Sequence, residues 1–339
     1  MDILTQGLLG AAMAQSAAPG REVRRALGIG FFAGLLADAD VLIQSEGDAL
    51  LTLEYHRHFT HALLFIPFGA LLAALLLWPW LRKSMPFAAA YRYSLLGYLL
   101  SGVLDALTSY GTYLLWPFSG TRVAWNLIAV VDPLFTLLLL GGVAFAAIRS
   151  SARPVHLALG LCVCYLGFSA FQQSRVEQAM QQIAATRGDR VEAMVVKPTM
   201  GNVVLWRAIY LTRKEIVVDA MQAGATGLKH YPGGRIARIT PDELDSIAPP
   251  GSVLHEDLRT FHHLSDGYLA WHPQRAMVIG DLRYAMLPDR LLPLWGIGID
   301  PGRPERHAEV LTFRQTGADV RSRFICMLRG ASACGEPAP

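Results

Sequence analysis

The sequence predicts an α-helical integral membrane protein of about five transmembrane helices, followed by a C-terminal soluble α+β domain. Hydrophobic residues make up 53% of the 339 residues and charged residues only 17%, which is outside the usual range for a soluble globular domain. Residues 62–81 carry no charge and are long enough to cross a bilayer core of roughly 30 Å as a helix. From Arg175 onward, shorter segments alternate with glycine, asparagine and charged turns.

Five apolar stretches predict the membrane spans, at residues 26–44, 61–81, 93–113, 127–148 and 154–173, preceded by an amphipathic N-terminal helix. Asp38 and Asp40 interrupt the first span, and Asp105 interrupts the third. A carboxylate at membrane depth costs about 2.5–3.5 kcal/mol on insertion scales unless it is paired, metal-bound or hydrated. Each of the three is therefore a candidate functional residue. We expect a membrane domain over residues 1–174 and a soluble domain over residues 175–335.

Basic residues predict the orientation of these spans. They occupy alternate loops, at residues 21–25, at residues 81–92, and at Arg149 with Arg153. By the positive-inside rule these loops are cytoplasmic, so loops 45–60 and 114–126 and the soluble domain face the periplasm. The N-terminus has an acidic residue, Asp2, and no basic region, so we expect no cleavable signal peptide. A net charge of +3 without a basic stripe argues against nucleic-acid binding.

The soluble part predicts strands at residues 191–198, 203–212, 214–222, 267–273, 275–287 and 308–315, and short helices at 241–247 and 255–264. Cys162 and Cys164 lie in an apolar run, where free cysteine is commonly small hydrophobic filler. Cys326 and Cys334 are compatible with a disulfide if this domain lies outside the cytoplasm, which their spacing does not decide.

Carboxylates and imidazoles gather near the outward ends of the predicted spans. Asp38 and Asp40 point to nearly opposite faces of an intact helix, so both serve one site only if the helix ends or unwinds there. Oxygen ligands at a broken helix end suit a divalent cation, whereas the alternative is two solvated loop residues. His56 and His61 add imidazoles at the start of the second span, with interfacial histidines as the alternative.

Other polar residues surround this pattern. Arg57 is suited to clamp a phosphate or to pair with an aspartate, and Thr60 is placed to cap a helix that begins at His61. The side chains of Ser101, Asp105 and Thr108 share one helix face, where the alternative for the carboxylate is a hydrogen-bonded structural role. Asp132 precedes a proline and fits an ordinary helix N-cap as well as a functional role. Taken together, five or six side chains of the kind that bind metals fall at one membrane face.

The motifs "MDILTQGLLGAA", "GLLADADVL", "YHRHFTHALLF", "LDALTSYGT" with "LLWPFS", and "VDPLFTLLLL" occur in this order over residues 1–150. Together they resemble a bacterial family of membrane-bound, metal-dependent hydrolases, also described as inner-membrane-associated and LexA-regulated. The segment "VIGDLRYAMLPD…PLWGI" is similar to the C-terminal region of one branch of that family. The residues that match the family are Asp2, Thr5, Asp38, Asp40, His56, Arg57, Thr60, His61, Asp105, Thr108, Gly111 and Asp132.

One residue departs from the family pattern. Relatives usually have histidine where this chain has Ser101, four residues before Asp105. If that histidine is a metal ligand, this chain has a poorer site, uses water in its place, or has lost the activity.

The resemblance and the residue pattern predict an inner-membrane hydrolase that acts at the outward membrane face on phosphoester or related bonds of lipid or lipid-linked substrates. A divalent ion, zinc or manganese, would be held by Asp38, Asp40, His56, His61 and Asp105. Arg57 would contact an anionic group, and Asp132 or Asp2 would orient ligands or act as a general base, with Thr5, Thr60, Ser101 and Thr108 in support. The alternatives are a transporter, or a scaffold that binds an envelope protein and keeps a structural or vestigial metal site.

Overall fold

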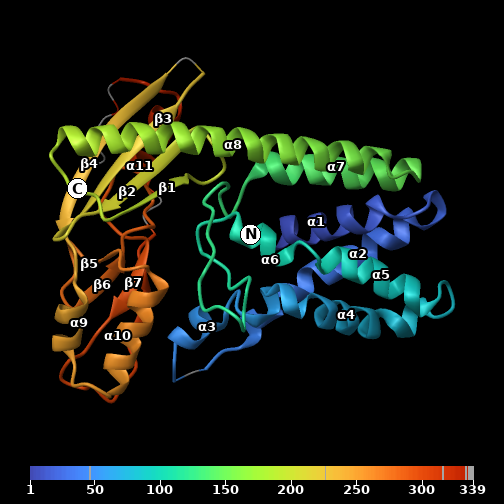
Figure 1. The fold of residues 1–339 in the computed structure, drawn as a ribbon, viewed down its shortest axis with the longest axis horizontal. Coiled ribbons are helices and arrows are strands. Elements are labelled where there is room, and N and C mark those ends of the chain that lie inside the picture. The colour runs from blue at the N-terminus through green and yellow to red at the C-terminus, as the bar shows by residue number, and fades with distance from the viewer. Residues whose placement is uncertain (46, 226, 315–316, 333, 335–339) are drawn as a thin grey trace. The chain divides into compact units, whose positions relative to one another are not determined.

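The computed structural model describes residues 1–339 except 46, 226, 315–316, 333 and 335–339 (Figure 1). It divides the chain into two compact units. The helical unit contains Met1–Ile43, Tyr55–Phe171 and Met200–Asn202, and the α+β unit contains Gln44–Glu54, Gln172–Thr199 and Val203–Pro339. The chain therefore passes between the two units several times. The first such excursion, Gln44–Glu54, is part of the predicted outward loop 45–60.

The helical unit is built around α1 (Ile3–Ser16), which packs against α2 (Val23–Leu36), α5 (Phe87–Tyr98) and α7 (Pro133–Arg149). A Cβ atom added at Gly10 would lie 2.3 Å from the carbonyl oxygen of Gly30, so glycine at this position lets α1 and α2 pack closely. Nearly all of α1 from Thr5 to Gln15 is buried. The prediction of an amphipathic N-terminal helix is therefore wrong, because neighbouring helices bury the residues from Thr5 to Gln15 with the exception of the half-buried Met13.

The predicted spans that carry carboxylates are broken rather than continuous. Span 26–44 consists of α2 followed by the 3₁₀ helix η2 (Ala37–Leu42), and span 93–113 contains the end of α5 followed by the short helix α6 (Ser101–Ala106). Among the described residues, two helices are long and apolar enough to cross a membrane, Leu63–Leu81 and Arg153–Thr186. They correspond to η4 (Leu63–Phe65) with α4 (Ile66–Leu81), and to α8 (Arg153–Thr186). Helix α7 is apolar but has 17 residues, so five spans are not confirmed.

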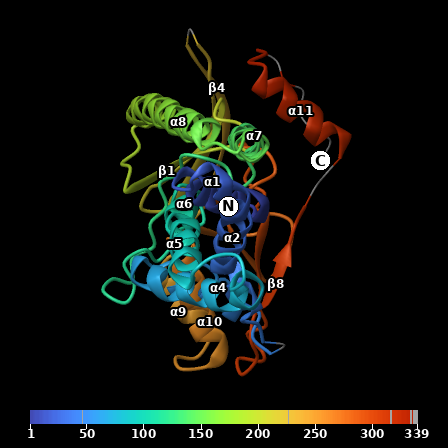
Figure 2. The same cartoon turned by 90° about the vertical axis from the view of Figure 1, so that its right-hand side faces the viewer.

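Small helical segments fill the remaining turns of this region. They are η1 (Gly20–Glu22), α3 (Leu50–Tyr55) and η3 (Phe59–His61). Figures 1 and 2 show α7 running alongside the first part of α8. A Cβ atom added at Gly142 of α7 would lie 2.3 Å from the Cβ of Ala158 in α8, so the two helices are in close contact there.

In its described residues, the α+β unit contains two antiparallel four-stranded sheets. The first has the order β1 (Ala193–Pro198), β2 (Leu205–Leu211), β3 (Glu215–Ala223), β4 (Leu228–Ala237). The second has the order β5 (Leu269–Trp271), β6 (Val278–Asp281), β7 (Trp295–Gly298), β8 (Glu309–Thr312). Three helices accompany them in the described part of the unit, α9 (Pro241–Ile247), α10 (Val253–Leu264) and α11 (Ala318–Leu328). The predicted strands and both predicted helices are present, although residue 315 lies outside the described residues.

The predictions missed β4, β7 and α11. Strand β4 contains Pro232, Gly233 and Gly234, residue types that normally argue against a strand interior. The register between β3 and β4 shifts at Val218 and Asp219, and this irregularity accommodates them. Strand β7 has two glycines in four residues, so its sequence carries little strand signal.

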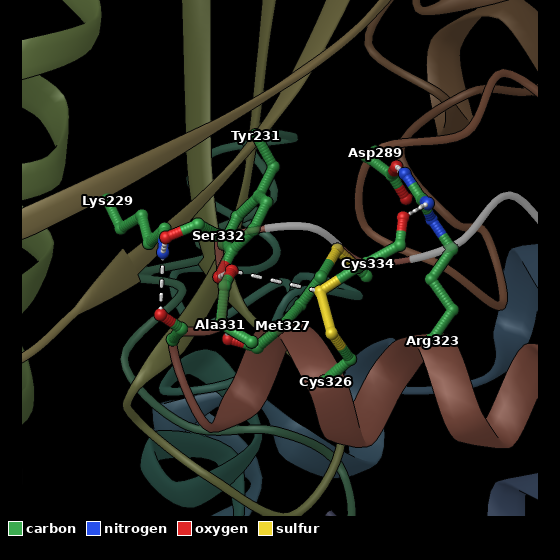
Figure 3. The surroundings of a disulfide bond; sticks show 10 residues. Lys229, Tyr231, Asp289, Arg323, Cys326, Met327, Ala331, Ser332 and Cys334 are labelled. Carbon is green, nitrogen blue, oxygen red and sulfur yellow. Dashed lines mark hydrogen bonds and ion pairs between the residues drawn. A yellow bond between two sulfur atoms is a disulfide. The ribbon is translucent and has the colours of Figure 1, made fainter.

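Two features hold the α+β unit together around its sheets. Leu50, in the segment Gln44–Glu54, is 2% exposed and belongs to an apolar cluster with Ile239, Leu258 and Ile297. A disulfide joins Cys326 of α11 to Cys334 (Figure 3). The spacing of the two cysteines did not decide whether they are bonded. Cys162 and Cys164 are free, the first buried and the second exposed.

Candidate metal centre

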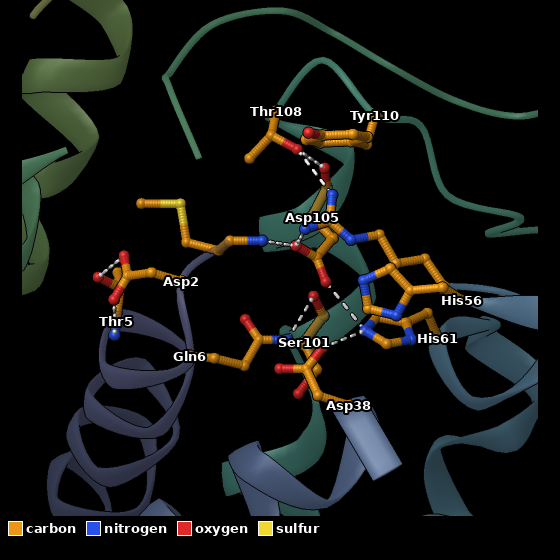
Figure 4. Close-up of polar contacts among 12 residues, drawn as sticks. Asp2, Thr5, Gln6, Asp38, His56, His61, Ser101, Asp105, Thr108 and Tyr110 are labelled. Carbon is orange, nitrogen blue, oxygen red and sulfur yellow. Dashed lines mark hydrogen bonds and ion pairs between the residues drawn. The ribbon is translucent and has the colours of Figure 1, made fainter. Parts of the chain in front are cut away.

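Polar side chains from separate short elements meet at the broken helix ends of the helical unit (Figure 4). Helix η2 supplies Asp38 and Asp40, the segment after α3 through η3 supplies His56 to His61, and α6 supplies Asp105. His61 and Asp105 are buried, at 1% and 0% exposure. The sequence places these residues in different predicted spans, and the interruptions in those spans bring them together.

Asp38, His61 and Asp105 form a trio whose ligand atoms all lie within 4.8 Å of one another. His61 Nε2 is 2.9 Å from Asp105 Oδ2 and 3.3 Å from Asp38 Oδ1. Within the described residues, His61 Nε2 and Asp105 Oδ2 are buried and neither makes a hydrogen bond of acceptable geometry. Since buried polar atoms are normally satisfied, a ligand shared by these atoms would account for the arrangement. The oxygen and imidazole donors fit a divalent metal ion.

Asp40, predicted as a ligand, lies on the other side of His61. Its Oδ2 accepts hydrogen bonds from the Arg57 backbone amide at 2.8 Å and from Thr60 Oγ1 at 2.7 Å. The same oxygen is 3.3 Å from His61 Nδ1. Such a carboxylate orients a histidine so that its Nε2 faces a metal. Asp40 is therefore placed to orient His61 and is not part of the trio.

The helix type explains why Asp38 and Asp40 flank one histidine. A 3₁₀ helix has three residues per turn, so side chains two positions apart are separated by about a third of a turn. In η2 this puts Asp38 beside Nε2 and Asp40 beside Nδ1 of His61. The predicted unwinding of the helix is present at this point. His56, also predicted as a ligand, bonds through Nδ1 to Asp40 Oδ1 at 3.0 Å, and its side chain is 34% exposed.

Arg57 is buried beside the trio and is already paired. Its Nη2 is 3.1 Å from Asp105 Oδ1, and its Nη1 donates to Thr108 Oγ1 at 3.0 Å. The guanidinium also lies over the Tyr110 ring at 5.3 Å from the centroid. Of the two predicted roles, anion clamp or aspartate partner, the structure has the second. The amino group of Met1 also pairs with Asp105 Oδ1, so one carboxylate oxygen is neutralised while Oδ2 faces His61.

Arg57 also adopts an unusual backbone conformation, with φ at 63°. This region is uncommon for residues other than glycine, and such residues occur often at functional sites because the surrounding structure must hold them. Here the Arg57 backbone amide donates a hydrogen bond to the Asp40 side chain, and the guanidinium group pairs with the Asp105 carboxylate. The strained residue therefore links the orienting aspartate to a member of the trio.

The two aspartates predicted as catalytic residues are helix caps. Asp2 caps α1, where its side chain accepts from the Thr5 amide at 3.0 Å and from Thr5 Oγ1 at 2.6 Å. Asp132 caps α7, where its side chain accepts from the Phe135 amide at 3.0 Å and from the Tyr165 hydroxyl at 2.8 Å. Capping accounts for both carboxylates without any chemistry. Neither belongs to the trio, and Thr5 belongs to the Asp2 cap.

The supporting residues divide in a similar way. Thr60 was predicted to cap a helix beginning at His61, which is wrong, because Thr60 lies inside η3 and its hydroxyl donates to Asp40. Thr108 accepts from Arg57 and donates to the Asp105 carbonyl at 2.8 Å. Ser101 is buried at the start of α6, and its carbonyl accepts from Gln6 Nε2 at 3.3 Å.

Besides Met1 and Tyr110, three further residues near the trio were missed. Gln6 is a buried polar residue of α1, and its position in an apolar stretch was a usable signal. The Tyr98 hydroxyl donates to the Thr60 carbonyl at 2.7 Å. A Cβ atom added at Gly102 would lie 2.0 Å from the His61 carbonyl oxygen, so only glycine lets α6 approach this closely. Nothing in the sequence identified Tyr98 or Gly102.

Apolar side chains next to the trio in sequence are exposed. Leu42, in the same 3₁₀ helix as Asp38, is 79% exposed, and Leu63, two residues after His61, is 44% exposed. Phe118, in the loop after α6, is 82% exposed. Exposed apolar side chains mark a surface that meets lipid or another apolar partner where they form a contiguous patch, whereas single ones are ordinary. Leu42 and Leu63 place exposed apolar side chains close in sequence to the ligands Asp38 and His61.

Comparison with known proteins places these residues in context. The protein-family model described as YdjM inner membrane protein matches residues 1–176, which include every residue of the trio. The uncharacterized protein YfhP of Bacillus subtilis (strain 168) is 25% identical over 188 residues, covering 55% of this chain and 56% of that protein. The chain thus spans about half the length of the curated relative it matches. No solved structure matches.

Proposed function

The chain belongs to the YdjM inner membrane protein family, and from that premise we propose that it is a metal-dependent hydrolase of phosphoester or related bonds in lipid or lipid-linked substrates. The observation that carries this proposal is the trio of Asp38, His61 and Asp105, in which His61 Nε2 and Asp105 Oδ2 are buried, lie 2.9 Å apart and form no hydrogen bond of acceptable geometry within the described residues. We propose zinc or manganese as the metal, because the donors are one imidazole and two carboxylates.

The residues around the trio have distinct tasks in this proposal. Asp38, His61 and Asp105 would hold the ion, and Asp40 keeps His61 Nε2 directed at it. When bound, a divalent ion lowers the pKa of water toward neutrality and polarises the bond to be broken. Arg57 pairs with Asp105 Oδ1 and offsets its charge, and Asp105 Oδ2 faces His61. Asp2 and Asp132 have no catalytic part here, since both are caps.

A lipid or lipid-linked substrate is supported by the surface around the trio. Leu42 and Leu63 are exposed apolar neighbours of the metal ligands in sequence, and Phe118 is exposed in the loop after α6. An acyl chain lying on such a surface would place its headgroup beside the polar centre. A water-soluble substrate would gain nothing from these side chains.

We also propose that the helical unit is multi-pass and that the centre faces the periplasm. Arg24 Nε donates to the Ala147 carbonyl at 2.9 Å and Arg25 Nη1 to the Ser84 carbonyl at 3.3 Å, so the three basic loops gather at one end of the unit. By the positive-inside rule that end is cytoplasmic. Helix α8 begins there at Arg153 and leads into the α+β unit. The disulfide in the α+β unit supports an oxidising compartment.

The test uses the full chain, purified in detergent without chelators. Mass spectrometry of metals should find stoichiometric zinc or manganese in the wild type, and its loss in His61→Gln. His307→Gln, a histidine of the α+β unit that also lies between two aspartates, is the matched control and should keep the metal. An absence of metal in the wild type, or equal metal in His61→Gln, would sink the proposal.

Activity is measured on the same preparations. Vesicles of phosphatidylethanolamine and phosphatidylglycerol are incubated with the metal-loaded wild type, and the lipid products are analysed by liquid chromatography and mass spectrometry. Products that form with the wild type but not with His61→Gln support a hydrolase. If the metal is present and no product forms, the alternative of a scaffold with a structural metal is favoured. Ser101, which stands where relatives usually have histidine, is the residue that would explain such a loss of activity.

A further inference from the structure

A groove lies between α7 and the beginning of α8, and it shares no residue with the candidate metal centre. Its volume is about 470 Å³. We propose that this groove binds an anionic phospholipid, with one acyl chain along its apolar part and the headgroup phosphate held by Arg149 and Arg153. The proposal does not depend on the hydrolase activity, because it concerns another surface of the helical unit.

The apolar part of the groove is shaped by small and large side chains. Gly142 and Ala158 are buried where the two helices meet, with Gly141 beside them, so the bottom of the groove has little side-chain bulk. Phe145 and Leu157 form part of the lining and are 59% and 66% exposed. In a membrane-embedded helical unit, exposed side chains at this position face acyl chains.

The polar end of the groove is formed by two arginines. Arg149 is the last residue of α7 and Arg153 is the first residue of α8, and both are exposed. Neither guanidinium has an acidic partner among the residues that the structure describes. Ser150, in the left-handed conformation, closes the turn that joins the two helices. Two guanidinium groups that have no acidic partner in the described part of the chain therefore lie at one end of an apolar groove.

Charge complementarity identifies the occupant. A guanidinium group binds phosphate through paired hydrogen bonds, and an anionic membrane surface attracts arginines near it. A phosphatidylglycerol headgroup keeps its full negative charge for the two arginines, whereas the choline of phosphatidylcholine offsets its phosphate. The apolar groove and its charged end thus match the chain and the headgroup of one anionic phospholipid in the cytoplasmic leaflet.

Binding is measured by native mass spectrometry of the full chain in neutral detergent, titrated with dioleoyl phosphatidylglycerol or dioleoyl phosphatidylcholine. The wild type should bind phosphatidylglycerol more tightly. Removing each guanidinium should weaken this binding about fivefold, so that Arg149→Gln with Arg153→Gln loses roughly 25-fold, with little effect on phosphatidylcholine. Unchanged phosphatidylglycerol binding by the double variant would overturn the proposal.

Matched variants separate the groove from general effects. Gly141→Phe should block the groove and weaken phosphatidylglycerol binding, because open space surrounds the position of its Cβ atom. Gly160→Phe has equally open surroundings on α8 but lies outside the groove, so it should bind like the wild type. Arg82→Gln with Lys83→Gln removes two charges from another basic loop and should also have little effect. Equal losses in these controls would show nonspecific attraction and contradict the proposal.

Discussion

Two groups of identical composition, one in each unit, differ in how their atoms are satisfied. Each has one histidine and two aspartates with ligand atoms within 4.8 Å, and the groups are Asp38, His61 and Asp105 in the helical unit and Asp48, Asp257 and His307 in the α+β unit. In the first group, a nitrogen and an oxygen are buried without hydrogen-bond partners in the described part of the chain. In the second, the histidine side chain is 37% exposed.

The carboxylates of the second group are occupied by the backbone. Asp257 Oδ2 accepts from the Ala308 amide at 2.7 Å, and Asp48 Oδ1 accepts from the Leu50 and Leu51 amides at 2.9 and 3.1 Å. His307 Nδ1 is bonded to Asp257 at 3.0 Å. Composition and proximity therefore do not identify a metal centre. The first group differs from the second because its facing ligand atoms, His61 Nε2 and Asp105 Oδ2, are buried and form no hydrogen bond of acceptable geometry within the described residues.

The largest expected effect comes from Asp105→Asn. This change leaves Arg57 buried without its charge partner, and breaking a buried pair costs about 3–5 kcal/mol. Asp48→Asn is the matched change in the second group, and because asparagine also caps a helix it should cost no more than about 1 kcal/mol. The measurement is unfolding of the full chain by SDS in mixed micelles. Equal losses of stability in the two variants would break the comparison.

A smaller loss of stability is expected from Gly102→Ala. This variant tests whether the first group depends on the close approach of the α6 backbone to His61. The added Cβ would meet the His61 carbonyl oxygen at 2.0 Å, so the backbone must shift and the chain should lose about 1–3 kcal/mol. Metal affinity should fall as well, since His61 moves. Gly160→Ala has open space and should not destabilise the helix. Metal binding that survives Gly102→Ala unchanged would show that this approach does not shape the site.

The smallest effect concerns pH and the second group. Burial raises the pKa of Asp257 from its ordinary value of 3.8, against the opposing influence of the Ala308 amide and His307. The folded chain then binds a proton more tightly than the unfolded chain, so this group's contribution to stability is greatest at acidic pH and falls as pH rises from 3.8 through the folded pKa.

Asp257→Asn removes this titration. The stability of the wild type relative to the variant should therefore decline from pH 4 to pH 7. Hydrogen exchange of α10 and β8 in the full chain, followed by mass spectrometry, measures it. A difference that grows with pH would mean that the carboxylate is stabilised by His307 more than it is penalised by burial.

Residue types and spacing predicted a helical membrane part followed by an α+β part, although five spans are not confirmed, and the trio contains three of the five predicted metal ligands. The two-residue separation of Asp38 and Asp40 required a broken helix, and η2 is that break. The family resemblance is confirmed by the match over residues 1–176. Strands β1, β2 and β3 of the first sheet were predictable because their apolar and β-branched residues are bounded by turn residues.

Roles that depend on hydrogen bonds between distant residues were not predictable. Asp40 and Asp38 are equivalent as sequence, yet only the fold puts one on each side of the His61 ring. Asp132 fits a cap or a ligand equally well until Phe135 and Tyr165 are seen to bond to it. The polar residues of α1 suggested a solvent face, whereas Gln15 is buried and donates to the carbonyls of Val23 and Val143.

The segment Gln44–Glu54 has a consequence for the order of biosynthesis. It separates Asp40 from His56 along the chain, and its Leu50 packs with Ile239, Leu258 and Ile297, which are translated much later. A nascent chain that has just released His61 from the ribosome therefore holds Asp40 and His56 without the packing partners of the segment that joins them. The apolar packing of this segment is therefore complete only after the C-terminal half has been synthesised.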